Sequence, residues 1–535
     1  MRYSKLNCVQ RIGSADGKGD VQPHRLVGNA RFFMRKIFVS GVSLRFHQDI
    51  ERIAGLFYPK VKVTQQRQEA DGWVAFHVDA SERIRVGVTL TDPAQDQTWF
   101  GDDEQEAKAT AQDQNRLLKR AVHRALLKVL EKATGVRQPW GILTGVRPTK
   151  LLHKLFLDGL SAEKAREVLV GDYRLLPDKV DLLQEIVQRQ TAVLPDLYQL
   201  DREVSLYIGI PFCPTKCAYC TFPAYAIRGR NGAVDEFLAG LHEEIAAVGA
   251  WLERNQVPVT TIYFGGGTPT SITTAELEGL FRRLQVSIPG YDQVRELTVE
   301  AGRPDTLDEE KLDLLRRWQV DRISINPQSF EENTLKLIGR HHTVKETLEK
   351  YELARSMGLH NINMDLIIGL PGEGLDTFRQ SLRTMEELRP QSLTVHTLSF
   401  KRGSHMTRNP EKYKTAGREE ITEMVNEARR WTQRMGYIPY YLYRQKNILG
   451  NQENVGYAFP GEESLYNIMI MEERQTIIGL GCGAVSKVMP PGTGKVQRLP
   501  NPKEPLAYID TYQQNIRKKL AILDEAWSTR RVEPT

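Results

Sequence analysis

Three cysteines lie close together in this 535-residue chain, as Cys213-Pro-Thr-Lys-Cys217-Ala-Tyr-Cys220. Three thiolates at this spacing can hold three irons of a four-iron cluster and leave the fourth iron open to a ligand. A structural zinc site usually has four ligands in two separated pairs, and here neither a second pair nor a nearby histidine follows. The other cysteines, Cys8 and Cys482, are far away in the sequence, which argues against a disulfide framework. The spacing therefore favours an iron–sulfur cluster with one exchangeable iron.

The cysteines follow a β-branched and aromatic run, Val204 to Ile210, which has the length of a strand and ends at Pro211. Amphipathic helical segments follow this run and the next four of the similar runs, which are 260–264, 296–300, 322–326, 361–368 and 391–400. Repeated strand–helix units predict a parallel sheet, either open or closed into a barrel. In both arrangements functional groups gather at the carboxyl ends of the strands, where the cysteines are.

Four of these helical segments are preceded by a Ser/Thr-x-x-Glu pattern, which is typical of a capping box at a helix start. The four patterns begin at Thr273, Thr306, Ser329 and Thr343. We therefore expect each of these hydroxyl residues to be the N-cap of the helix that follows.

Polar and glycine residues gather where the strands are expected to end. Gly265-Gly266-Gly267-Thr268 follows the second strand, Glu300 ends the third and Gln328 follows the fourth. The glycines lack the pattern of a nucleotide triphosphate loop, so we expect them to let a small zwitterion approach the backbone. Asp365 lies within an apolar run, where an unpaired carboxylate is costly. Either a neighbour or a ligand can satisfy it, and its place near the rim favours a ligand.

The chain divides into parts of different composition. Residues 1–33 are polar and aperiodic, which predicts a disordered extension, and the strand-like run that begins at Met34 suggests that translation starts there. We expect a small α+β domain at 34–102, a helical region at 103–199, a barrel core at 200–402 and a C-terminal α+β domain at 403–535. Residues 140–150 carry two basic groups but have the composition of a loop that connects helices.

The composition excludes several classes of function. No stretch approaches 18 consecutive apolar residues and no signal peptide pattern is present, so we expect a cytoplasmic protein without stable membrane insertion. A reducing compartment also suits exposed thiolates. The 73 basic and 67 acidic residues nearly balance, which argues against a dedicated nucleic-acid surface.

The chain resembles the radical S-adenosylmethionine superfamily in its Cys-x3-Cys-x2-Cys motif, in Tyr219 before the third cysteine and in Gly-Gly-Gly-Thr-Pro, over about residues 200–490. It is most similar to the oxygen-independent coproporphyrinogen III oxidase (dehydrogenase) family, in its HemZ-type branch. The segments that carry this resemblance are Tyr-Ile-Gly-Ile-Pro-Phe-Cys, Arg-x-Ser-x-x-x-Gln-Ser-Phe, Asp-Leu-Ile-x-Gly-Leu-Pro-Gly and Gly-Leu-Gly-x-Gly-Ala-x-Ser. The resemblance implies an α/β fold, with a partial parallel (β/α)6 barrel and a C-terminal domain that covers the substrate.

The resemblance also implies a reaction and its cofactors. A [4Fe-4S] cluster and S-adenosyl-L-methionine generate a radical that takes a hydrogen atom from a propionate side chain of coproporphyrinogen III. Loss of CO2 and one electron then leaves a vinyl group, twice per substrate, which gives protoporphyrinogen IX. A reductant such as flavodoxin or ferredoxin is an implied partner. No catalytic residue is implied beyond the cluster and the cofactor.

By the same resemblance, the cluster ligands are Cys213, Cys217 and Cys220. The residues implied to contact S-adenosylmethionine are Tyr207, Tyr219, Gly266, Gly267, Thr268, Glu300, Gln328, Arg340 and Asp365. Arg340 has the alternative of a surface cation at a helix end.

The sequence departs from the family at positions that concern the substrate. Phe222 stands where the dehydrogenases have a further cysteine, and Asn326-Pro327 precedes Gln328 where the family has glycine. One alternative function is that of a haem chaperone or haem-binding carrier, although the His-Asn-x-x-Tyr-Trp motif of the chaperones begins here with Tyr466. Another is a different radical reaction on a tetrapyrrole, such as ring opening of haem.

Two C-terminal segments bear on the substrate and on the last cysteine. The run Tyr440 to Arg444 offers aromatic faces and a cation to a tetrapyrrole with propionates, and an edge strand with mixed faces is the alternative. Cys482 is expected to be a small buried residue, with a reactive thiol as the alternative.

Overall fold

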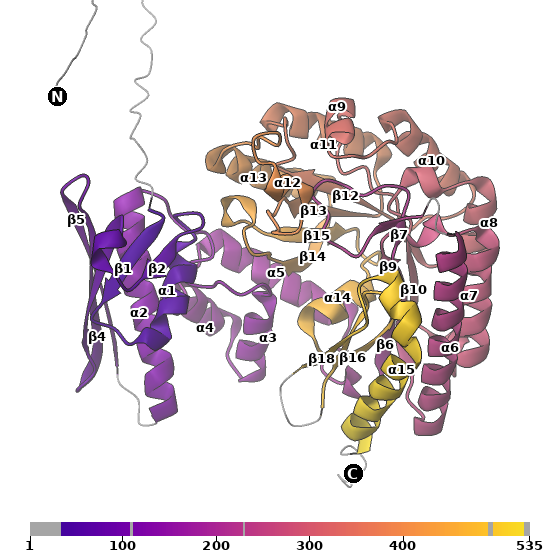
Figure 1. Ribbon diagram of the computed structural model, residues 1–535, viewed down its shortest axis with the longest axis horizontal. Coiled ribbons are helices and arrows are strands. Elements are labelled where there is room, and N and C mark those ends of the chain that lie inside the picture. Colours follow the sequence, from indigo (N-terminus) through magenta and orange to yellow (C-terminus); the bar gives the residue numbers. More distant parts are fainter. Residues whose placement is uncertain (1–33, 107–110, 228–230, 491–495, 529–535) are drawn as a thin grey trace, which may run out of the picture.

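The computed structural model describes residues 34–106, 111–227, 231–490 and 496–528. Figure 1 shows an N-terminal unit at the left, a larger strand–helix body at the right and helices α3 to α5 between them. The predicted extension at 1–33 lies outside the described residues. Within the described residues, the helices do not include one with the length and apolarity needed to span a membrane.

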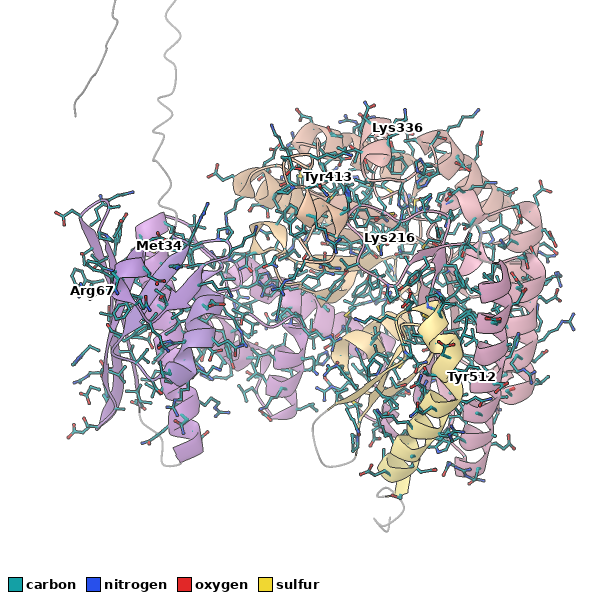
Figure 2. The ribbon with its side chains drawn as sticks, in the orientation of Figure 1. Met34, Arg67, Lys216, Lys336, Tyr413 and Tyr512 are labelled. Carbon is teal, nitrogen blue, oxygen red and sulfur yellow. The ribbon has the colours of Figure 1, made fainter. Side chains whose placement is uncertain are left out.

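The N-terminal unit is a five-stranded sheet in the order β2-β1-β3-β4-β5. Two helices, α1 (His47–Ala54) and α2 (Ala111–Thr134), contribute to the same core as the strands. The strands are β1 (Lys36–Ser40), β2 (Lys62–Thr64), β3 (Gly72–Asp79), β4 (Arg83–Asp92) and β5 (Gln97–Glu106). Met34 and Arg67, labelled in Figure 2, lie in this unit, and Met34 is fully buried.

Two periodicities of the sequence build this core. Alternate residues of β4, from Ile84 to Leu90, are buried, as expected for a strand with one face on a core. Helix α2 buries residues at helical spacing, among them Val122, Leu126 and Leu130. The expected boundary at residue 102 falls inside β5, and the shared core continues through α2 to Ile142.

The helical connection consists of α3 (Thr149–Leu157), α4 (Ala162–Glu167) and α5 (Pro177–Val193). Helix α5 packs into the core of the larger body through residues such as Leu183 and Ile186. Two side chains of this region reach a single buried carboxylate of that body, Glu453. Lys179 Nζ lies 2.6 Å from one oxygen, and Trp140 Nε1 donates to the other at 2.9 Å. Polar contacts as well as apolar packing therefore fix the connection to the larger body.

The larger body is built on an eleven-stranded sheet in the order β14-β15-β13-β12-β11-β10-β9-β6-β16-β17-β18. All six predicted strands are confirmed and pair in parallel with their neighbours. They are β6 (Val204–Ile210), β9 (Val259–Gly266), β10 (Glu296–Glu300), β11 (Arg322–Ser324), β12 (Ile362–Ile368) and β13 (Ser392–Thr397). This is the predicted partial parallel barrel of strand–helix units.

Helices cover the outside of the sheet (Figure 1). They are α6 (Asn231–Asn255), α7 (Thr274–Ser287), α8 (Glu309–Arg317), α9 (Glu332–Leu337), α10 (Val344–Ser356) and α11 (Leu375–Leu388). Lys216 and Lys336, labelled in Figure 2, mark the loop after β6 and helix α9.

The predicted helix starts are correct in two of four cases. Thr273 forms a complete capping box with Glu276, and Thr343 accepts a hydrogen bond from the Glu346 amide. Asp308 caps α8 instead of Thr306, and Glu331 caps α9 instead of Ser329. The Thr306 hydroxyl instead donates to the Arg303 carbonyl, and the Ser329 hydroxyl donates to Glu373. These two side chains are therefore not used as N-caps.

Residues after 403 extend the barrel sheet at both of its edges. Strands β14 (Ile438–Tyr443) and β15 (Asn454–Ala458) continue it beyond β13 in antiparallel pairing. At the other edge β16 (Thr476–Gly481) pairs in parallel with β6, followed by β17 (Val485–Val488) and β18 (Gln497–Pro500). The C-terminal helices are α12 (His405–Arg408), α13 (Arg418–Met435), α14 (Leu465–Glu472) and α15 (Pro505–Ser528).

A buried ion pair attaches α15 to the barrel. Lys519 Nζ lies 2.5 Å from Glu244 on α6, and both side chains are 0% exposed. The Glu244 carboxylate also accepts from the Gly481 amide at 2.7 Å and from the Tyr508 hydroxyl at 2.8 Å. Removing one partner of a pair buried in this way is strongly destabilising, because the other charge is left without compensation.

Candidate active site

The three clustered cysteines lie in a loop that leaves the carboxyl end of β6. Two short strands, β7 (Phe212–Cys213) and β8 (Tyr225–Ala226), pair with each other and close the base of this loop. Between them, the Ala218 amide donates to the Ile338 carbonyl at 2.8 Å, and the Thr215 hydroxyl donates to the Gly339 carbonyl at 3.1 Å. Hydrogen bonds to carbonyls of the surrounding barrel therefore help to fix the loop.

The glycine segment after β9 lies against this loop. A Cβ atom on Gly266 would come within 2.7 Å of the Ile210 carbonyl oxygen, and one on Gly267 within 2.4 Å of the Phe212 carbonyl oxygen. Gly266 also has a φ of +112°, which side-chain-bearing residues rarely adopt. The next residue, Thr268, places its hydroxyl 3.3 Å from Cys213 Sγ. The chain needs glycine here because the backbones of two loops meet.

One cavity of about 600 Å³ brings together every site residue that the sequence indicated. The set that lines it is Tyr207, Cys213, Cys217, Tyr219, Cys220, Gly266, Gly267, Thr268, Glu300, Gln328, Arg340 and Asp365. These residues come from β6, β9, β10 and β12 and from the segments that follow β6, β9 and β11. They meet because the strands are parallel, so that their carboxyl ends lie at one edge of the sheet.

Glu300, at the end of β10, faces a group of stacked tyrosines. It accepts a hydrogen bond of 2.5 Å from the Tyr263 hydroxyl. The Tyr263 ring lies 4.3 Å from that of Tyr466 and 6.1 Å from that of Tyr207. Burial raises the pKa of Glu300 to about 7, although the bond from Tyr263 acts in the opposite direction. The side chain can thus change charge near neutral pH.

Gln328 and Arg340 hold the opposite side of the cysteine loop. Gln328 adopts a left-handed backbone conformation, with φ of 66°, and its side-chain oxygen accepts from the Tyr219 hydroxyl at 2.9 Å. Arg340 donates to the Asn326 carbonyl at 2.5 Å and to the Gly302 carbonyl at 3.3 Å. It is 6% exposed, so the alternative of a surface cation is wrong.

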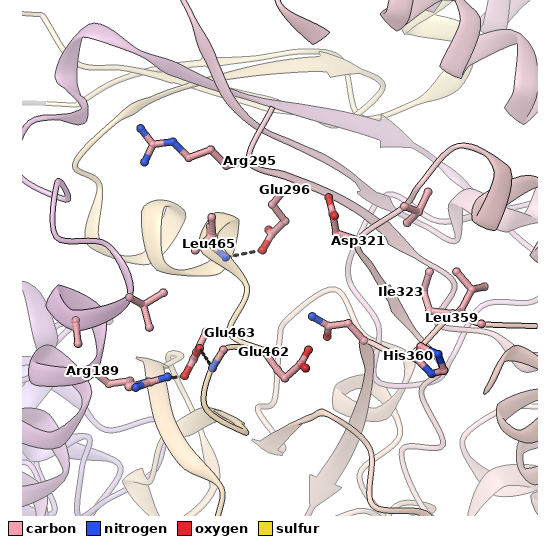
Figure 3. A pocket seen from close by; sticks show the side chains of 16 residues that line it. Arg189, Arg295, Glu296, Asp321, Ile323, Leu359, His360, Glu462, Glu463 and Leu465 are labelled. Carbon is pink, nitrogen blue, oxygen red and sulfur yellow. Dashed lines mark hydrogen bonds and ion pairs between the residues drawn. The ribbon is translucent and has the colours of Figure 1, made fainter. Parts of the chain in front are cut away.

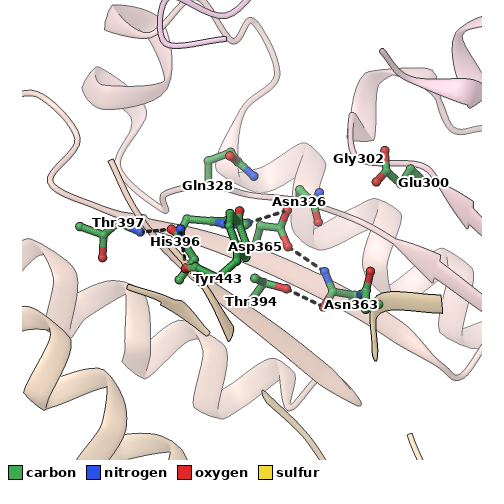
Figure 4. A network of polar contacts seen from close by, with 12 residues as sticks. Glu300, Gly302, Asn326, Gln328, Asn363, Asp365, Thr394, His396, Thr397 and Tyr443 are labelled. Atoms are coloured by element: carbon green, nitrogen blue, oxygen red, sulfur yellow. Dashed lines mark hydrogen bonds and ion pairs between the residues drawn. The ribbon is translucent and has the colours of Figure 1, made fainter. Parts of the chain in front are cut away.

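Asp365 is already held by neighbours inside the cavity (Figure 4). Asn363 Nδ2 donates to one carboxylate oxygen at 2.7 Å, and His396 Nε2 lies 3.4 Å from the other. The other ring nitrogen of His396 is 3.1 Å from the Tyr443 hydroxyl. Burial alone would raise the pKa of Asp365, but His396 and the hydrogen bonds hold it below its usual value. The carboxylate is therefore ionised and fixed in position.

The sequence did not single out His396. It lies within β13 two residues from Thr394, and both line the cavity from a strand whose other residues are buried. The alternation of Thr394 and His396 with apolar residues is the signal that could have found it.

The structure corrects the prediction for the run from Tyr440 to Arg444. Tyr441 and Tyr443 line the cavity, but Tyr440 and Arg444 do not. Arg444 is buried and donates to the Leu143 carbonyl at 2.6 Å, in the segment before α3. The reason is that successive residues of a strand point to opposite faces. Cys482 is 3% exposed and lines the cavity, and burial raises its pKa to about 12, as expected for a small buried residue.

A second cavity, of about 730 Å³, lies at the opposite ends of the barrel strands. It is lined by residues at the starts of β10 and β11, including Glu296 and Asp321. Figure 3 shows Arg189 directed at Glu463, with 2.5 Å between Nε and Oε1, and Glu296 accepting from the Leu465 amide. Its charged groups thus tie the C-terminal segment to the barrel. This face of a barrel generally serves stability.

The residues of the first cavity fit an iron–sulfur cluster and a small polar ligand. Its three thiols are not in disulfides, and burial raises the pKa of Cys213 to about 11 and also raises that of Cys220. Such thiols become thiolates when a metal binds them. Several buried polar atoms of the lining have no partner among the described residues, namely Arg340 Nε, Tyr466 OH, Thr298 Oγ1, Ser324 Oγ and Asn326 Oδ1. A polar ligand would satisfy them.

Among the described residues, no three His, Cys, Asp or Glu side chains are grouped so that they could hold one metal ion.

Comparisons with known proteins show which family the chain belongs to. The Radical SAM superfamily matches residues 207–385. The chain is 53% identical over 489 residues to the oxygen-independent coproporphyrinogen-III oxidase-like protein HemZ of Bacillus subtilis (strain 168), covering 90% of this chain and 96% of the relative. It is 32% identical over 280 residues to the heme chaperone HemW of the same organism, covering 52% of this chain and 70% of that one.

Among solved structures, coproporphyrinogen III oxidase (HemN) from Escherichia coli is 21% identical, with a TM-score of 0.47 over 61% of this chain and 73% of that chain. Membership of the radical SAM superfamily implies S-adenosylmethionine and a [4Fe-4S] cluster as cofactors. The long match to HemZ is decisive for the branch, because it extends over nearly the full length of both chains. This protein is a radical SAM oxidoreductase and belongs to the oxygen-independent coproporphyrinogen-III oxidase-like family.

Proposed function

We propose that this protein oxidatively decarboxylates two propionate side chains of coproporphyrinogen III to vinyl groups, which gives protoporphyrinogen IX. Each side chain loses one hydrogen atom, one electron and CO2, and the carbon–carbon double bond forms from the remaining electrons. A bound [4Fe-4S] cluster and S-adenosylmethionine would supply the acceptor of the hydrogen atom. The electron goes to an acceptor outside the chain.

The observation that carries this proposal is the single cavity that joins three thiols to a lining of tyrosines and unpartnered polar atoms. Tyr441 and Tyr443 present aromatic rings, which lie 6.5 Å apart at an interplanar angle of 5°. Flat apolar faces of this kind suit a pyrrole ring. The long match to a coproporphyrinogen-III oxidase-like relative supports the same substrate class.

The proposed roles of the chain's own residues follow from their places in the cavity. Cys213, Cys217 and Cys220 would hold the cluster. Gly266, Gly267 and Thr268 would offer backbone and hydroxyl groups to the methionyl part of the cofactor, and Glu300 would accept from its amino group. Asp365, fixed by Asn363 and His396, presents ionised oxygens that suit a ribose. Tyr207, Tyr219, Gln328 and Arg340 would complete the cofactor pocket.

A one-electron reductant such as flavodoxin or ferredoxin is part of the proposal, because reductive cleavage of the cofactor consumes an electron that the chain does not supply. We also propose a cytoplasmic location, because a reducing compartment keeps the three thiols available for the cluster.

The test is an anaerobic assay of the reconstituted protein with reductant, S-adenosylmethionine and coproporphyrinogen III. We expect protoporphyrinogen IX and two CO2 per substrate, measured by mass spectrometry and by release of labelled CO2. Cleavage of S-adenosylmethionine without a tetrapyrrole product would contradict the proposal. Replacing the substrate by haem tests the alternative of a radical reaction on haem.

A haem-carrier function is the second candidate, because a relative named as a heme chaperone shares 32% identity over half of the chain. His396 is the histidine of the cavity lining, and both of its ring nitrogens have protein partners, the Tyr443 hydroxyl and Asp365. This arrangement does not favour axial ligation of haem iron by His396. Stoichiometric haem uptake and transfer to an acceptor, without decarboxylation, would establish the carrier function instead.

A further inference from the structure

We propose that Lys487 is a carboxylate-binding residue of the active-site cavity, which anchors one acidic side chain of a tetrapyrrole. This inference rests on the proposed function, because it names how that substrate is held. Lys487 lies on β17 and lines the same cavity as the cysteines.

Lys487 belongs to a group of four cations around a single carboxylate, Glu473. Arg147 and Arg498 both contact Glu473 Oε1, the latter at 2.9 Å, and Lys150 lies 2.6 Å from Oε2. Lys487 Nζ is the most distant, at 3.5 Å from Oε1. Each of the four has Glu473 as its only ion-pair partner within the described residues. The group therefore carries an excess of positive charge.

The shorter contacts leave Lys487 as the least compensated member. An ammonium group has three donors. Lys487 Nζ donates one to the Ile470 carbonyl at 3.2 Å, and its ion pair with Glu473 is long. Burial and the neighbouring Arg147 lower its pKa to about 8, so it still carries its charge at neutral pH. A largely buried ammonium, with a side chain that is 11% exposed and with spare donors on a cavity wall, is suited to an anionic ligand.

The other cations of the lining are less suited to this role, and Arg340, which donates to the Asn326 and Gly302 carbonyls, belongs to the proposed cofactor pocket. Arg303 makes a two-bond pair with Asp305, at 3.0 and 2.9 Å. Arg322 donates to Asn361, to Asn363 and to the Glu462 carbonyl. Lys401 lies over the Phe222 ring, 5.4 Å from its centroid. Lys487 is in contrast a lining residue whose ammonium group has only the Ile470 carbonyl and the distant Glu473 as partners among the described residues.

The chemistry of the proposed substrate matches this subsite. Coproporphyrinogen III has four propionates, and the product retains two of them. A fixed cation that binds one retained carboxylate would orient the ring while another propionate reacts. Because Arg147 and Lys150 precede or begin α3, the segment before the barrel would also take part in holding the substrate.

The test measures how tightly the full-length, cluster-loaded protein binds coproporphyrin III, the stable oxidised tetracarboxylate. Binding is measured by the quenching of fluorescence as the ligand is added. Its uncharged tetramethyl ester is the matched ligand. We expect Lys487→Met to weaken the affinity for the acid about tenfold or more, because one charge-assisted hydrogen bond is lost. The affinity for the ester should stay the same. Lys487→Arg should retain most of the affinity. Lys503→Met, at an exposed lysine after β18, should change neither ligand.

Three outcomes would overturn the subsite. In the first, the wild-type protein binds the acid no more tightly than the ester. In the second, Lys487→Met has the same affinity for the acid as the wild type, and its thermal melt shows that it is equally well folded. The substitution could also weaken only the binding of flavodoxin, which would make the cationic group a docking surface for an acidic protein. Binding that depends on Lys487 without any decarboxylation would instead refute the proposed function and leave the subsite standing.

Discussion

Glu300 provides a pH-dependent test of the cofactor site. Its pKa of about 7, raised mainly by burial, means that about half of the side chains are protonated at neutral pH. If the carboxylate accepts a hydrogen bond from the amino group of S-adenosylmethionine, only the ionised form binds well. Affinity should then rise with pH, because the ionised fraction increases as the pH passes through the pKa.

The size of the effect follows from the fraction of competent protein. With a pKa of about 7, roughly 9% of Glu300 is ionised at pH 6 and 91% at pH 8, so the apparent Kd should fall about tenfold between these values. Glu300→Gln cannot titrate and should lose this part of the slope. At pH 8 it should bind about 10- to 100-fold more weakly than the wild type, the range expected for one hydrogen bond to a charged group.

The assay is anaerobic equilibrium dialysis of labelled S-adenosylmethionine with cluster-loaded protein between pH 6 and 8. The amino group of the ligand also titrates near pH 8, but it does so equally with both proteins. The difference between the two pH profiles therefore isolates Glu300. A wild-type profile parallel to that of Glu300→Gln would refute the reasoning, and so would equal affinities at pH 8.

Three further substitutions test other parts of the structure. Cys217→Ala should abolish both the brown chromophore and cleavage of S-adenosylmethionine, since two thiolates should not retain a four-iron cluster, and an active, coloured variant would refute the assignment. Gly267→Ala should weaken binding of S-adenosylmethionine, because its Cβ would lie 2.4 Å from the Phe212 carbonyl oxygen. A wild-type affinity in equilibrium dialysis would contradict this prediction. Lys519→Met should destabilise the barrel edge by about 3–5 kcal/mol because Glu244 stays buried. Faster hydrogen exchange of the Gly481 amide in the variant would report this loss of stability. An exchange rate equal to that of the wild type would contradict the prediction.

Local patterns were sufficient to predict the barrel and its cavity. The six strands are short β-branched runs, and each must be buried on both faces, so the sequence marks them strongly. Once parallel strands are expected, Glu300, Gln328 and Asp365 are placed at one edge of the sheet without further information. The glycine segment could be recognised because two loop backbones meet there and leave no space for side chains.

Contacts between distant segments could not be predicted in the same way. The pairing of β16 with β6 joins residues about 270 positions apart, and neither strand carries a local mark of its partner. Lys487 has no visible role until Arg147 and Glu473 are brought beside it. Arg444 was misplaced for a related reason. Its position in the run suggested the substrate, but the strand register directs it to carbonyls of the segment before α3.

The pairing of β16 with β6 also sets an order for biogenesis. The strand that leads into the cysteine loop has an open edge until β16 has left the ribosome, about 270 residues later. At 5–20 residues per second this interval is on the order of 10–50 s. An unpaired edge strand next to three thiols is prone to misassembly. The edge of β6 is therefore completed only when β16 has formed, so a chain that ends before β16 would leave the strand below the cysteine loop unpaired on one side.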